Sequence, residues 1–322
     1  MDRQALKEFT HNAGGFLTID SSNYKQWVFR YTFLELEKDL GTKGDITTNS
    51  LFHKNKSVKA KIVARESGVL AGREEIMYFL VESDPSFRPV IRGKFEVNFK
   101  FKDGDAFEAG DEIAGISGDI HDLLAVERVA LNLLMRMSGV ATFTGITVDT
   151  VKEYDVLITP TRKTLWGLLD KKAVSLGGGG THRLNLGDAI LVKDNHLDVF
   201  GRDFEKVMDS IAKSDPNCRF VEIEVDNKKE CLELCAEMVK FISRGAVKCV
   251  CAVLMDNMNS GDIIATIEEL KKKNLYERLL FEASGGITEK NVVEYAKTGV
   301  DIISMGCLTG KSNFLDMSME MI

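Results

Sequence analysis

The chain has 322 residues, of which 44% are hydrophobic, which is enough for two domains or for one barrel with an added module. Its formal net charge of -7 argues against a nucleic-acid-binding surface, because such a surface needs a basic face that replaces counterions on the phosphates. The amino-terminal MDRQALKEFTHN has mixed charge and no apolar core, and no apolar run approaches bilayer length. We therefore expect a cytoplasmic protein that does not interact with membranes.

The first part of the chain has the pattern of an α+β domain. A helix is predicted over residues 24–40 and another over 74–81. Apolar residues alternate with polar ones over 58–64 and 95–101, which is typical of half-buried antiparallel strands. We predict an α+β sandwich domain over residues 1–125, with the C-terminal end of the chain as a candidate to pack against it.

From about residue 120 the pattern changes. Two successive helices, carrying LLAVERVALNLLMRM and ATFTGITVDTVKEY, lead into short apolar strands that alternate with amphipathic helices. Such alternation indicates a parallel sheet, open or closed. We predict that residues 126–322 form a parallel β/α barrel, TIM-like and either complete or incomplete. The predicted strands are residues 155–158, 189–192, 220–225, 249–255, 279–283 and 301–304.

Polar residues follow each of the six predicted strands. Functional groups in barrels collect at the carboxyl ends of the strands, and backbone amides after the last two strands commonly hold phosphate. We therefore expect these residues to meet in one active site. They are Arg162 and Lys163, then Lys193, Glu224, Asp256, the turn from Ser284 through Gly285 to Gly286, and the turn from Ser304 to Gly306.

The segment from Thr161 to His196 is basic within an acidic protein, with an excess of three positive charges. This contrast predicts a confined site for a small anion with several negative charges, which guanidinium groups bind through paired hydrogen bonds. The charged residues are Arg162, Lys163, Lys171, Lys172, Arg183 and Lys193 against Asp170, Asp188 and Asp194, and His182 lies beside Arg183. Arg128 lies in an apolar helix, where its spacing favours an ion pair with Glu127 or another acid.

Several acidic residues fall on the predicted strands. Glu224 and Asp256 are suited to hold a hard divalent cation, or to form ion pairs with Lys163 and Lys193, and the two interpretations are compatible. Glu222 shares a face with Glu224, and Glu282 shares one with Ser284. Carboxylates that point into a barrel need cations or a metal as partners.

Other polar groups are less informative. The glycine run over residues 177–180 is compatible with close approach to a phosphate or with a flexible turn. His196 is a candidate base, although a structural role is favoured, and His11, His53 and His121 stay unassigned. The cysteines form no CxxC pair and fall in apolar stretches, which predicts buried reduced thiols. They are Cys218, Cys231, Cys235, Cys249, Cys251 and Cys307.

Ten ordered blocks over nearly the whole chain resemble the quinolinate phosphoribosyltransferase family, also called nicotinate-nucleotide pyrophosphorylase (carboxylating). The blocks are GDITT at 44–48, ARESGVLAG at 64–72, ERVALNLLMRMSGVAT at 127–142, TRKT at 161–164, GGGGTHR at 177–183, LVKDNH at 191–196, EIEVD at 222–226, MDNM at 255–258, EASGGI at 282–287 and GVDIISMGCLT at 299–309.

The resemblance implies transfer of phosphoribose from phosphoribosyl pyrophosphate to quinolinate, with release of CO2 and pyrophosphate, to give nicotinate mononucleotide for NAD biosynthesis. It also implies Mg²⁺ and a homo-oligomer, at least a dimer, in which a sandwich domain closes the barrel of its partner. The implied quinolinate ligands are Arg162, Lys163, His182, Arg183 and Lys193, with Arg128 from the neighbouring subunit. Those for phosphoribosyl pyrophosphate are Glu224, Asp256, Ser284 to Gly286, Ser304 and Gly306.

Within this set, Lys163, Lys193, Glu224 and Asp256 are the implied catalytic residues, and Glu224 and Asp256 would hold Mg²⁺ directly or through water. Two residues depart from the family pattern, Trp166 in place of a usual proline and Leu169 in place of a frequent arginine, which leaves the shape of that loop open. Alternatives are a related transferase for nicotinate or another heterocycle, a molybdenum-associated relative, a lyase with a Schiff base on Lys193, and a silent binding protein.

Overall fold

The computed structural model describes residues 2–83, 91, 93–214 and 218–322, and the chain forms two compact units. The barrel unit consists of Met1–Ala13, Ile146–Thr164 and Gly179–Gly310, and the sandwich unit of Gly14–Gly145, Leu165–Gly178 and Lys311–Ile322. The sequence predicts one boundary after residue 125, whereas each unit draws on three segments. Residues 161–196, which form one basic segment in the sequence, are therefore divided between the units.

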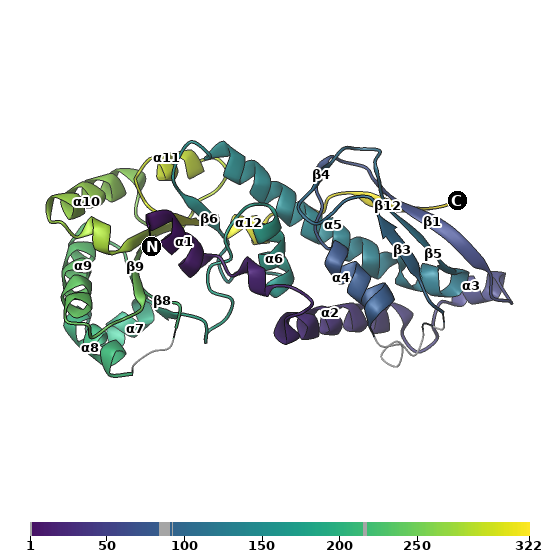
Figure 1. The fold of residues 1–322 in the computed structure, drawn as a ribbon, viewed down its shortest axis with the longest axis horizontal. Coiled ribbons are helices and arrows are strands. Elements are labelled where there is room, and N and C mark those ends of the chain that lie inside the picture. Colours follow the sequence, from purple (N-terminus) through teal and green to yellow (C-terminus); the bar gives the residue numbers. More distant parts are fainter. Residues whose placement is uncertain (1, 84–90, 92, 215–217) are drawn as a thin grey trace. The chain divides into compact units, whose positions relative to one another are not determined.

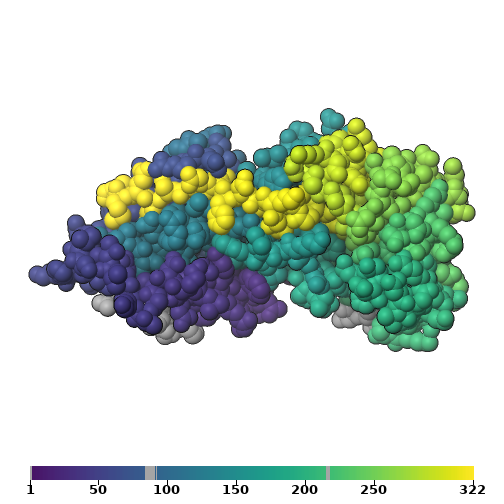
Figure 2. Space-filling view, turned by 180° about the vertical axis from the view of Figure 1, so that it is seen from behind, coloured from purple at the N-terminus to yellow at the C-terminus, as the bar shows by residue number. Residues whose placement is uncertain are grey.

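The sandwich unit contains a four-stranded antiparallel sheet in the order β12-β1-β5-β3, beside which helices α2, α4 and α5 lie (Figure 1). Both strands predicted for this region are present as β1 and β3. β12 pairs with β1 and lies on the surface of this unit (yellow in Figure 2), so the expectation that the C-terminal end packs here is confirmed. The bounds are β1 Ser57–Ala64, β3 Glu96–Phe99, β5 Glu112–Asp119, β12 Met317–Met321, α2 Ser22–Leu40, α3 Ile46–Leu51, α4 Arg73–Met77 and α6 Leu168–Leu176, and β2 Gly68–Val69 pairs with β4 Ala106–Phe107.

Helix α5 is a single helix over Ile120–Thr150, so the prediction of two successive helices was wrong. Gly139 lies inside this helix, and its lack of a side chain lets the carbonyl of Asn313 approach to 2.0 Å from where a Cβ would be. By length and composition α5 could cross a membrane, but 67% of its apolar window is buried. Packing in the core explains its apolar character.

The barrel unit contains a six-stranded parallel sheet in the order β6-β11-β10-β9-β8-β7. All six predicted strands are present. Among the described residues no pairing joins β6 to β7, so the β/α barrel is incomplete at that seam. The strands are β6 Leu157–Thr159, β7 Ile190–Val192, β8 Phe220–Val225, β9 Val250–Asp256, β10 Leu280–Ser284 and β11 Ile302–Ser304. The helices of this unit that follow β7 are α7 Asp194–Val199, α8 Phe204–Ser214, α9 Lys228–Ser243, α10 Ser260–Lys272, α11 Val292–Ala296 and α12 Cys307–Gly310.

The N-terminal helix α1, Arg3–His11, belongs to the barrel unit. Arg3 donates to both carboxylate oxygens of Asp301, at 2.5 and 2.7 Å, and Lys7 donates to the carbonyl of Asp155 at 3.0 Å and to its carboxylate. Such paired guanidinium–carboxylate contacts fix orientation as well as position. The first residues of the chain are therefore tied to the site-bearing unit.

The six cysteines are free thiols, which confirms the prediction of reduced cysteines. Cys231, Cys235, Cys251 and Cys307 are buried. Cys218 and Cys249 are only half-buried, with their Sγ atoms 3.5 Å apart, and burial raises the pKa of the Cys218 thiol to about 11. A thiol with a raised pKa is a poor nucleophile and a poor metal ligand.

Candidate active site

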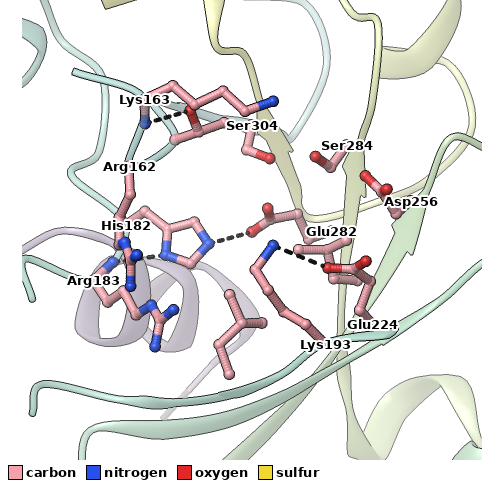
Figure 3. Close-up of a pocket in the computed structure, with 13 residues that line it drawn as sticks. Arg162, Lys163, His182, Arg183, Lys193, Glu224, Asp256, Glu282, Ser284 and Ser304 are labelled. Carbon is pink, nitrogen blue, oxygen red and sulfur yellow. Dashed lines mark hydrogen bonds and ion pairs between the residues drawn. The ribbon is translucent and has the colours of Figure 1, made fainter. Parts of the chain in front are cut away.

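A cavity of about 310 Å³ opens at the carboxyl ends of the barrel strands (Figure 3). Every one of the six strands is followed or ended by a residue that lines it. The sequence prediction that these polar residues meet is therefore confirmed. The lining residues are Thr161, Arg162, Lys163, His182, Arg183, Leu191, Lys193, Glu224, Leu254, Asp256, Glu282, Ser284 and Ser304.

The parallel register explains why these residues meet. Asp256 pairs with Ser284 across β9 and β10, and Glu224 pairs with Leu254 across β8 and β9. Residues in register at the ends of parallel strands present their side chains to the same edge of the sheet. Arg162 and Arg183 lie on one side of the cavity, and Ser284 and Asp256 lie on the other (Figure 3).

One side of the cavity is rich in cations. Arg162, Lys163 and Lys193 have exposed side chains, whereas Arg183 is only 5% exposed. Arg183 donates to the carbonyl of Ala189 at 3.3 Å, but its buried Nε has no partner among the described residues. Burial and the nearby Arg162 lower the pKa of Arg183. A bound anion would satisfy this Nε and offset the repulsion between the two guanidinium groups.

The opposite side carries two carboxylates. Lys193 Nζ lies 3.3 Å from Glu224 Oε2, so the predicted ion pair with Lys193 is present. Burial raises the pKa of Glu224, Lys193 lowers it, and Asp256 raises it again, so the net direction is upward. Asp256 therefore lies close enough to disfavour the charge of Glu224. A divalent cation would relieve this repulsion, which makes the pair chemically suited to Mg²⁺.

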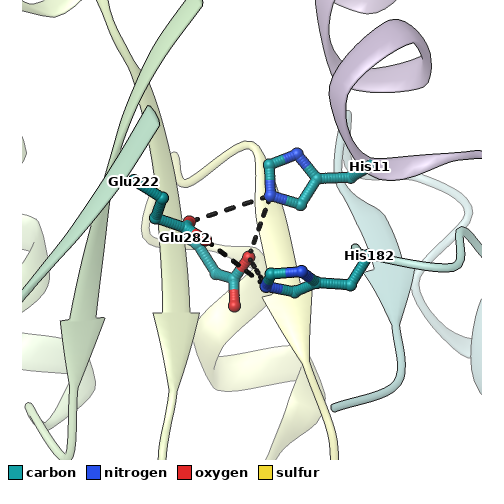
Figure 4. A group of neighbouring side chains, drawn as sticks. All are labelled: His11, His182, Glu222 and Glu282. Carbon is teal, nitrogen blue, oxygen red and sulfur yellow. Dashed lines mark ion pairs between the residues drawn. The ribbon is translucent and has the colours of Figure 1, made fainter. Parts of the chain in front are cut away.

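A buried cluster lies at the inner end of the cavity and consists of His11, His182, Glu222 and Glu282 (Figure 4). The Nε2 atom of each histidine faces both carboxylates, at 3.3 and 3.7 Å for His11 and at 3.4 Å twice for His182. Burial raises the pKa of Glu282, but the two imidazoles outweigh it, so the pKa is lowered. The inward carboxylates thus have the partners that the sequence analysis required, and these are imidazoles.

The sequence leaves His11 without a role, because no motif surrounds it and its partners in the cluster are more than 160 residues away. The main chain of His11 is also in contact with the loop that carries His182. Its carbonyl accepts hydrogen bonds from the N–H groups of Thr181 and His182 at 2.7 and 2.8 Å. A Cβ on Gly180 would lie 2.6 Å from the same carbonyl. Only glycine allows this approach, and the same holds for Gly177 against the carbonyl of Ala141, at 2.3 Å.

Two predicted cations of the basic segment do not line the cavity. Lys171 and Lys172 lie in α6 of the sandwich unit, where Lys172 pairs with the Glu74 carboxylate and, at 3.1 Å, with Glu75 Oε1. The Asp170 carboxylate next to them is paired with Arg136 at 2.9 and 3.0 Å. The prediction that the whole segment forms one anion site was therefore too broad.

Arg128 lies on α5 in the sandwich unit and its side chain is exposed. Among the described residues it forms no ion pair, so the predicted pairing with Glu127 or another acid is absent. His196 accepts a hydrogen bond on Nδ1 from the N–H of Lys193 at 2.9 Å. This contact caps α7 and fixes the turn that carries Lys193, as the structural interpretation of His196 predicted.

The loop after Lys163 is shaped by packing. Within the sandwich unit, Trp166 lies against Tyr31 with ring centroids 4.4 Å apart, and its carbonyl accepts from the indole of Trp27 at 3.2 Å. Asp170 accepts from the N–H groups of Leu165 and Trp166 at 2.9 and 3.0 Å. The tryptophan that departs from the family pattern thus anchors the loop in an aromatic cluster, and Leu169 is buried there.

The turns predicted to hold phosphate adjoin the cavity. Ser284 and Ser304 line it, whereas Gly285, Gly286 and Gly306 are not among its lining residues. Gly285 has a φ of 94° and a Cβ there would lie 2.3 Å from Asn257 Oδ1, so this position requires glycine. Gly286 has a φ of 64° and open space beside its Cα. The turn is thus accessible to a ligand.

Comparison with known proteins gives consistent matches over the chain. The family models "Quinolinate phosphoribosyl transferase, N-terminal domain" and "C-terminal domain" match residues 45–138 and 140–320. The chain is 36% identical to the probable nicotinate-nucleotide pyrophosphorylase (carboxylating) of Methanothermobacter thermautotrophicus, over 88% of this chain and 95% of that protein. It is also 36% identical to the protein of that name in Methanocaldococcus jannaschii, over 92% and 98%. The solved nicotinate-nucleotide pyrophosphorylase of Francisella tularensis superposes with a TM-score of 0.76 at 29% identity, covering 92% and 96%.

Proposed function

Because the chain belongs to the quinolinate phosphoribosyltransferase family, we propose that it transfers the phosphoribosyl group of phosphoribosyl pyrophosphate to quinolinate. The products are nicotinate mononucleotide, pyrophosphate and CO2. The observation that carries this proposal is the division of one cavity into a side with Arg162, Lys163 and Arg183 and a side with Glu224 and Asp256. The first side suits an aromatic diacid, and the second suits a ribose and its metal-bound leaving group.

The first step needs no base. The pyridine nitrogen of quinolinate has a free electron pair, which forms the bond to the anomeric carbon while the carbon–oxygen bond to pyrophosphate breaks with its electrons. Catalysis then depends on positioning and electrostatics. Arg162 and Arg183 would hold the diacid with its nitrogen directed at the ribose. Lys163 and Lys193 would stabilise the negative charge that develops on the departing pyrophosphate.

Glu224 and Asp256 would serve the ribose. As positive charge develops at the anomeric carbon, nearby carboxylates stabilise it. The same two residues would hold Mg²⁺, directly or through water, and the ion when bound would neutralise pyrophosphate oxygens. The effect of Asp256 on the Glu224 pKa supports this assignment. The open turn at Gly286 and the serines at 284 and 304 would hold the 5-phosphate.

The second step is loss of CO2. Once the ring nitrogen is bonded to ribose it carries a positive charge, so the electrons of the bond to the adjacent carboxylate can flow into the ring. A proton from solvent then replaces the lost carboxylate on that carbon. The chain supplies the cations that hold the remaining carboxylate in place, and we propose no general acid for this step.

Two alternatives are less well supported. A Schiff-base lyase requires a desolvated lysine with a lowered pKa, whereas the Lys193 side chain is 49% exposed and paired with Glu224. A nicotinate-specific transferase would need to bind one carboxylate only. Arg162 and Arg183, the two guanidinium groups assigned to the substrate, together carry more positive charge than one carboxylate requires.

We further propose that the enzyme is cytoplasmic and at least a dimer, with Arg128 completing the quinolinate site of the neighbouring subunit. Its exposed and unpaired guanidinium supports this role. Arg128→Ala and Arg162→Ala should each be inactive alone. Mixing them should restore activity through hybrid dimers with one intact site, and no recovery under conditions where subunits exchange would contradict the shared site.

The activity is tested by incubating the protein with phosphoribosyl pyrophosphate, Mg²⁺ and either quinolinate or nicotinate. Nicotinate mononucleotide and pyrophosphate should form in equal amounts from quinolinate. Product from nicotinate alone would favour the monoacid alternative and overturn the proposal. Omission of Mg²⁺ with a chelator present should stop the reaction, and unchanged turnover would remove the metal from the mechanism.

A further inference from the structure

We propose that His11 is a positioning residue of the candidate active site. Its ring is the imidazolium that compensates the buried carboxylates of Glu222 and Glu282. Its main chain is a fixed support for the loop that bears His182 and Arg183. The link to substrate binding rests on the proposed function. His11 lies outside the cavity lining and outside residues 45–320, which the family models match. Nothing in the family match therefore assigns it a role.

The position of His11 is fixed by its surroundings. It ends α1, which Arg3 and Lys7 anchor to the barrel unit. Its ring is fully buried and stacks on Phe220 at a centroid distance of 4.5 Å. Its carbonyl holds the N–H groups of Thr181 and His182, as described above. The next residues continue this connection, because the N–H of Ala13 donates to Thr181 Oγ1 at 2.8 Å.

One hydrogen bond and two ion-pair contacts assign two protons to His11. Its Nδ1 lies 2.7 Å from Thr10 Oγ1, and the hydroxyl hydrogen of Thr10 is already donated to the carbonyl of Leu6 at 2.8 Å. The threonine oxygen is therefore the acceptor, and Nδ1 carries a hydrogen. The other nitrogen, Nε2, faces the carboxylates of Glu222 and Glu282. A lone pair there would oppose two anions, so Nε2 also carries a hydrogen and the ring is an imidazolium.

The same reasoning gives His182 one proton. Its Nδ1 accepts the N–H of Arg183 at 2.7 Å, which the backbone of His182 makes possible by adopting a φ of 53°. The proton of the neutral ring therefore lies on Nε2, which donates toward Glu222 and Glu282. Burial lowers the pKa of both imidazoles and the two carboxylates raise it, with a net upward direction for His11 and a rise to about 9 for His182, so the carboxylates alone would favour a second proton on either ring. A second proton on His182 would cost the bond from Arg183, so we assign the charge to His11.

These protons argue against a metal in the cluster, although four suitable ligand atoms lie within 4.8 Å of one another. A metal on Nε2 of His182 would require a hydrogen on Nδ1. That hydrogen would then face the N–H of Arg183 at 2.7 Å, with two donors opposed. Only His11 has its Nδ1 hydrogen correctly placed for a metal ligand. The arrangement is that of a buried cluster of charged groups held at ion-pair distances.

The cluster bears on the cavity because His182 and Glu282 line it. With His11 as imidazolium, one positive charge offsets part of the charge of two carboxylates at the inner end of an anion site. Without it, both carboxylates would face the bound diacid uncompensated. Binding of quinolinate should therefore weaken, while binding of phosphoribosyl pyrophosphate, whose proposed groups lie on the other side of the cavity, should change less.

Two variants and a control test this role kinetically. His11→Ala removes the ring, and His11→Gln keeps a neutral donor but removes the charge. Both should raise the KM for quinolinate by roughly 10-fold and the KM for phosphoribosyl pyrophosphate by less than about 2-fold. Arg3→Ala is the matched control, because it loosens the anchor of α1 without touching the cluster. It should lower thermal stability and leave the KM for quinolinate unchanged.

Nitrogen-15 NMR of the histidine rings of the wild-type protein tests the proton assignment without any assay of activity. Hydrogens on both nitrogens of His11 and on Nε2 alone of His182, at neutral pH, would support it. A bare nitrogen on His11, or stoichiometric zinc bound after addition of zinc alone, would overturn it. Equal rises in the quinolinate KM for Arg3→Ala and His11→Gln would reduce His11 to a structural anchor. Wild-type protein without quinolinate turnover would instead refute the proposed function, and NMR would still decide the charge of His11.

Discussion

Two groups of basic side chains within residues 161–196 differ in what surrounds them. Arg162, Lys163 and Lys193 are exposed beside a cavity, and buried Arg183 keeps an unpaired Nε toward it. Lys172 is buried and paired with two glutamates of the sandwich unit. Burial lowers the pKa of Lys172, but Glu75 and Glu74 outweigh it and the pKa is raised. A buried cation paired with carboxylates supports the fold. Exposed cations beside the cavity, including Lys193 with its Glu224 partner, and the buried Arg183 with its unpaired Nε are available to a substrate.

The largest effect should follow from Arg183→Ala, which removes the buried guanidinium from the cavity. We expect kcat/KM for quinolinate to fall about 1,000-fold, or ~4 kcal/mol, because a charged partner of the substrate is lost in a desolvated site. Arg183→Lys keeps the charge but not the paired geometry and should recover only part of the loss. Steady-state kinetics would measure both. A loss of less than about 3-fold would place Arg183 with the structural cations.

Lys172→Met should act on stability instead. It leaves Glu75 buried without its cation, which should lower the free energy of unfolding by about 3 kcal/mol in urea titrations. Lys163→Met is the matched control in the cavity group, since the exposed Lys163 should change stability by less than about 0.5 kcal/mol. If Lys163→Met proved the more destabilising, the division into structural and substrate cations would fail.

Gly180→Ala should have a smaller effect, because its Cβ would lie 2.6 Å from the His11 carbonyl and the loop must shift to admit it. We expect a loss of about 1–2 kcal/mol in the free energy of unfolding, with a raised KM for quinolinate. Gly310→Ala is the matched control, since Gly310, like Gly180, has no positive φ but has no atom within 4 Å of the added Cβ. Equal changes in KM would show that contact with His11 is unimportant.

The pH dependence of stability tests whether the imidazoles compensate the charge of the buried Glu282. The imidazoles lower the folded-state pKa of Glu282 below its unfolded value of about 4.3. The contribution of Glu282 to the free energy of unfolding is therefore fully present above that pH. It is lost as the pH falls, because the unfolded state binds the proton first. In urea titrations between about pH 6 and pH 3, the free energy of unfolding should fall less steeply with pH for Glu282→Gln than for wild type. An equal slope would mean that Glu282 is not charge-compensated.

The sequence predicted the barrel and most of its cavity because strand patterns and the residues that follow them are local features. All six strands and the convergence of Arg162, Lys193, Glu224 and Asp256 follow from that pattern. The roles of these residues came from the resemblance and stay predictions.

What the sequence could not give depends on partners far along the chain. Lys172 pairs with glutamates about a hundred residues earlier, and His11 contacts a loop about 170 residues later. Helix α5 continues through Gly139 despite the low helix propensity of glycine, and the missing Cβ there admits the carbonyl of Asn313 from far along the chain. In each case tertiary packing, rather than a local pattern, decides the outcome.

The central claim is that the cations of the cavity bind a diacid, which then loses one carboxylate. The most direct test uses quinolinate labelled with carbon-13 in the carboxylate next to the ring nitrogen. With phosphoribosyl pyrophosphate and Mg²⁺ present, the label should leave entirely as CO2, in equal amount to the pyrophosphate released. Label retained in the nucleotide product, or pyrophosphate released without labelled CO2, would contradict the account.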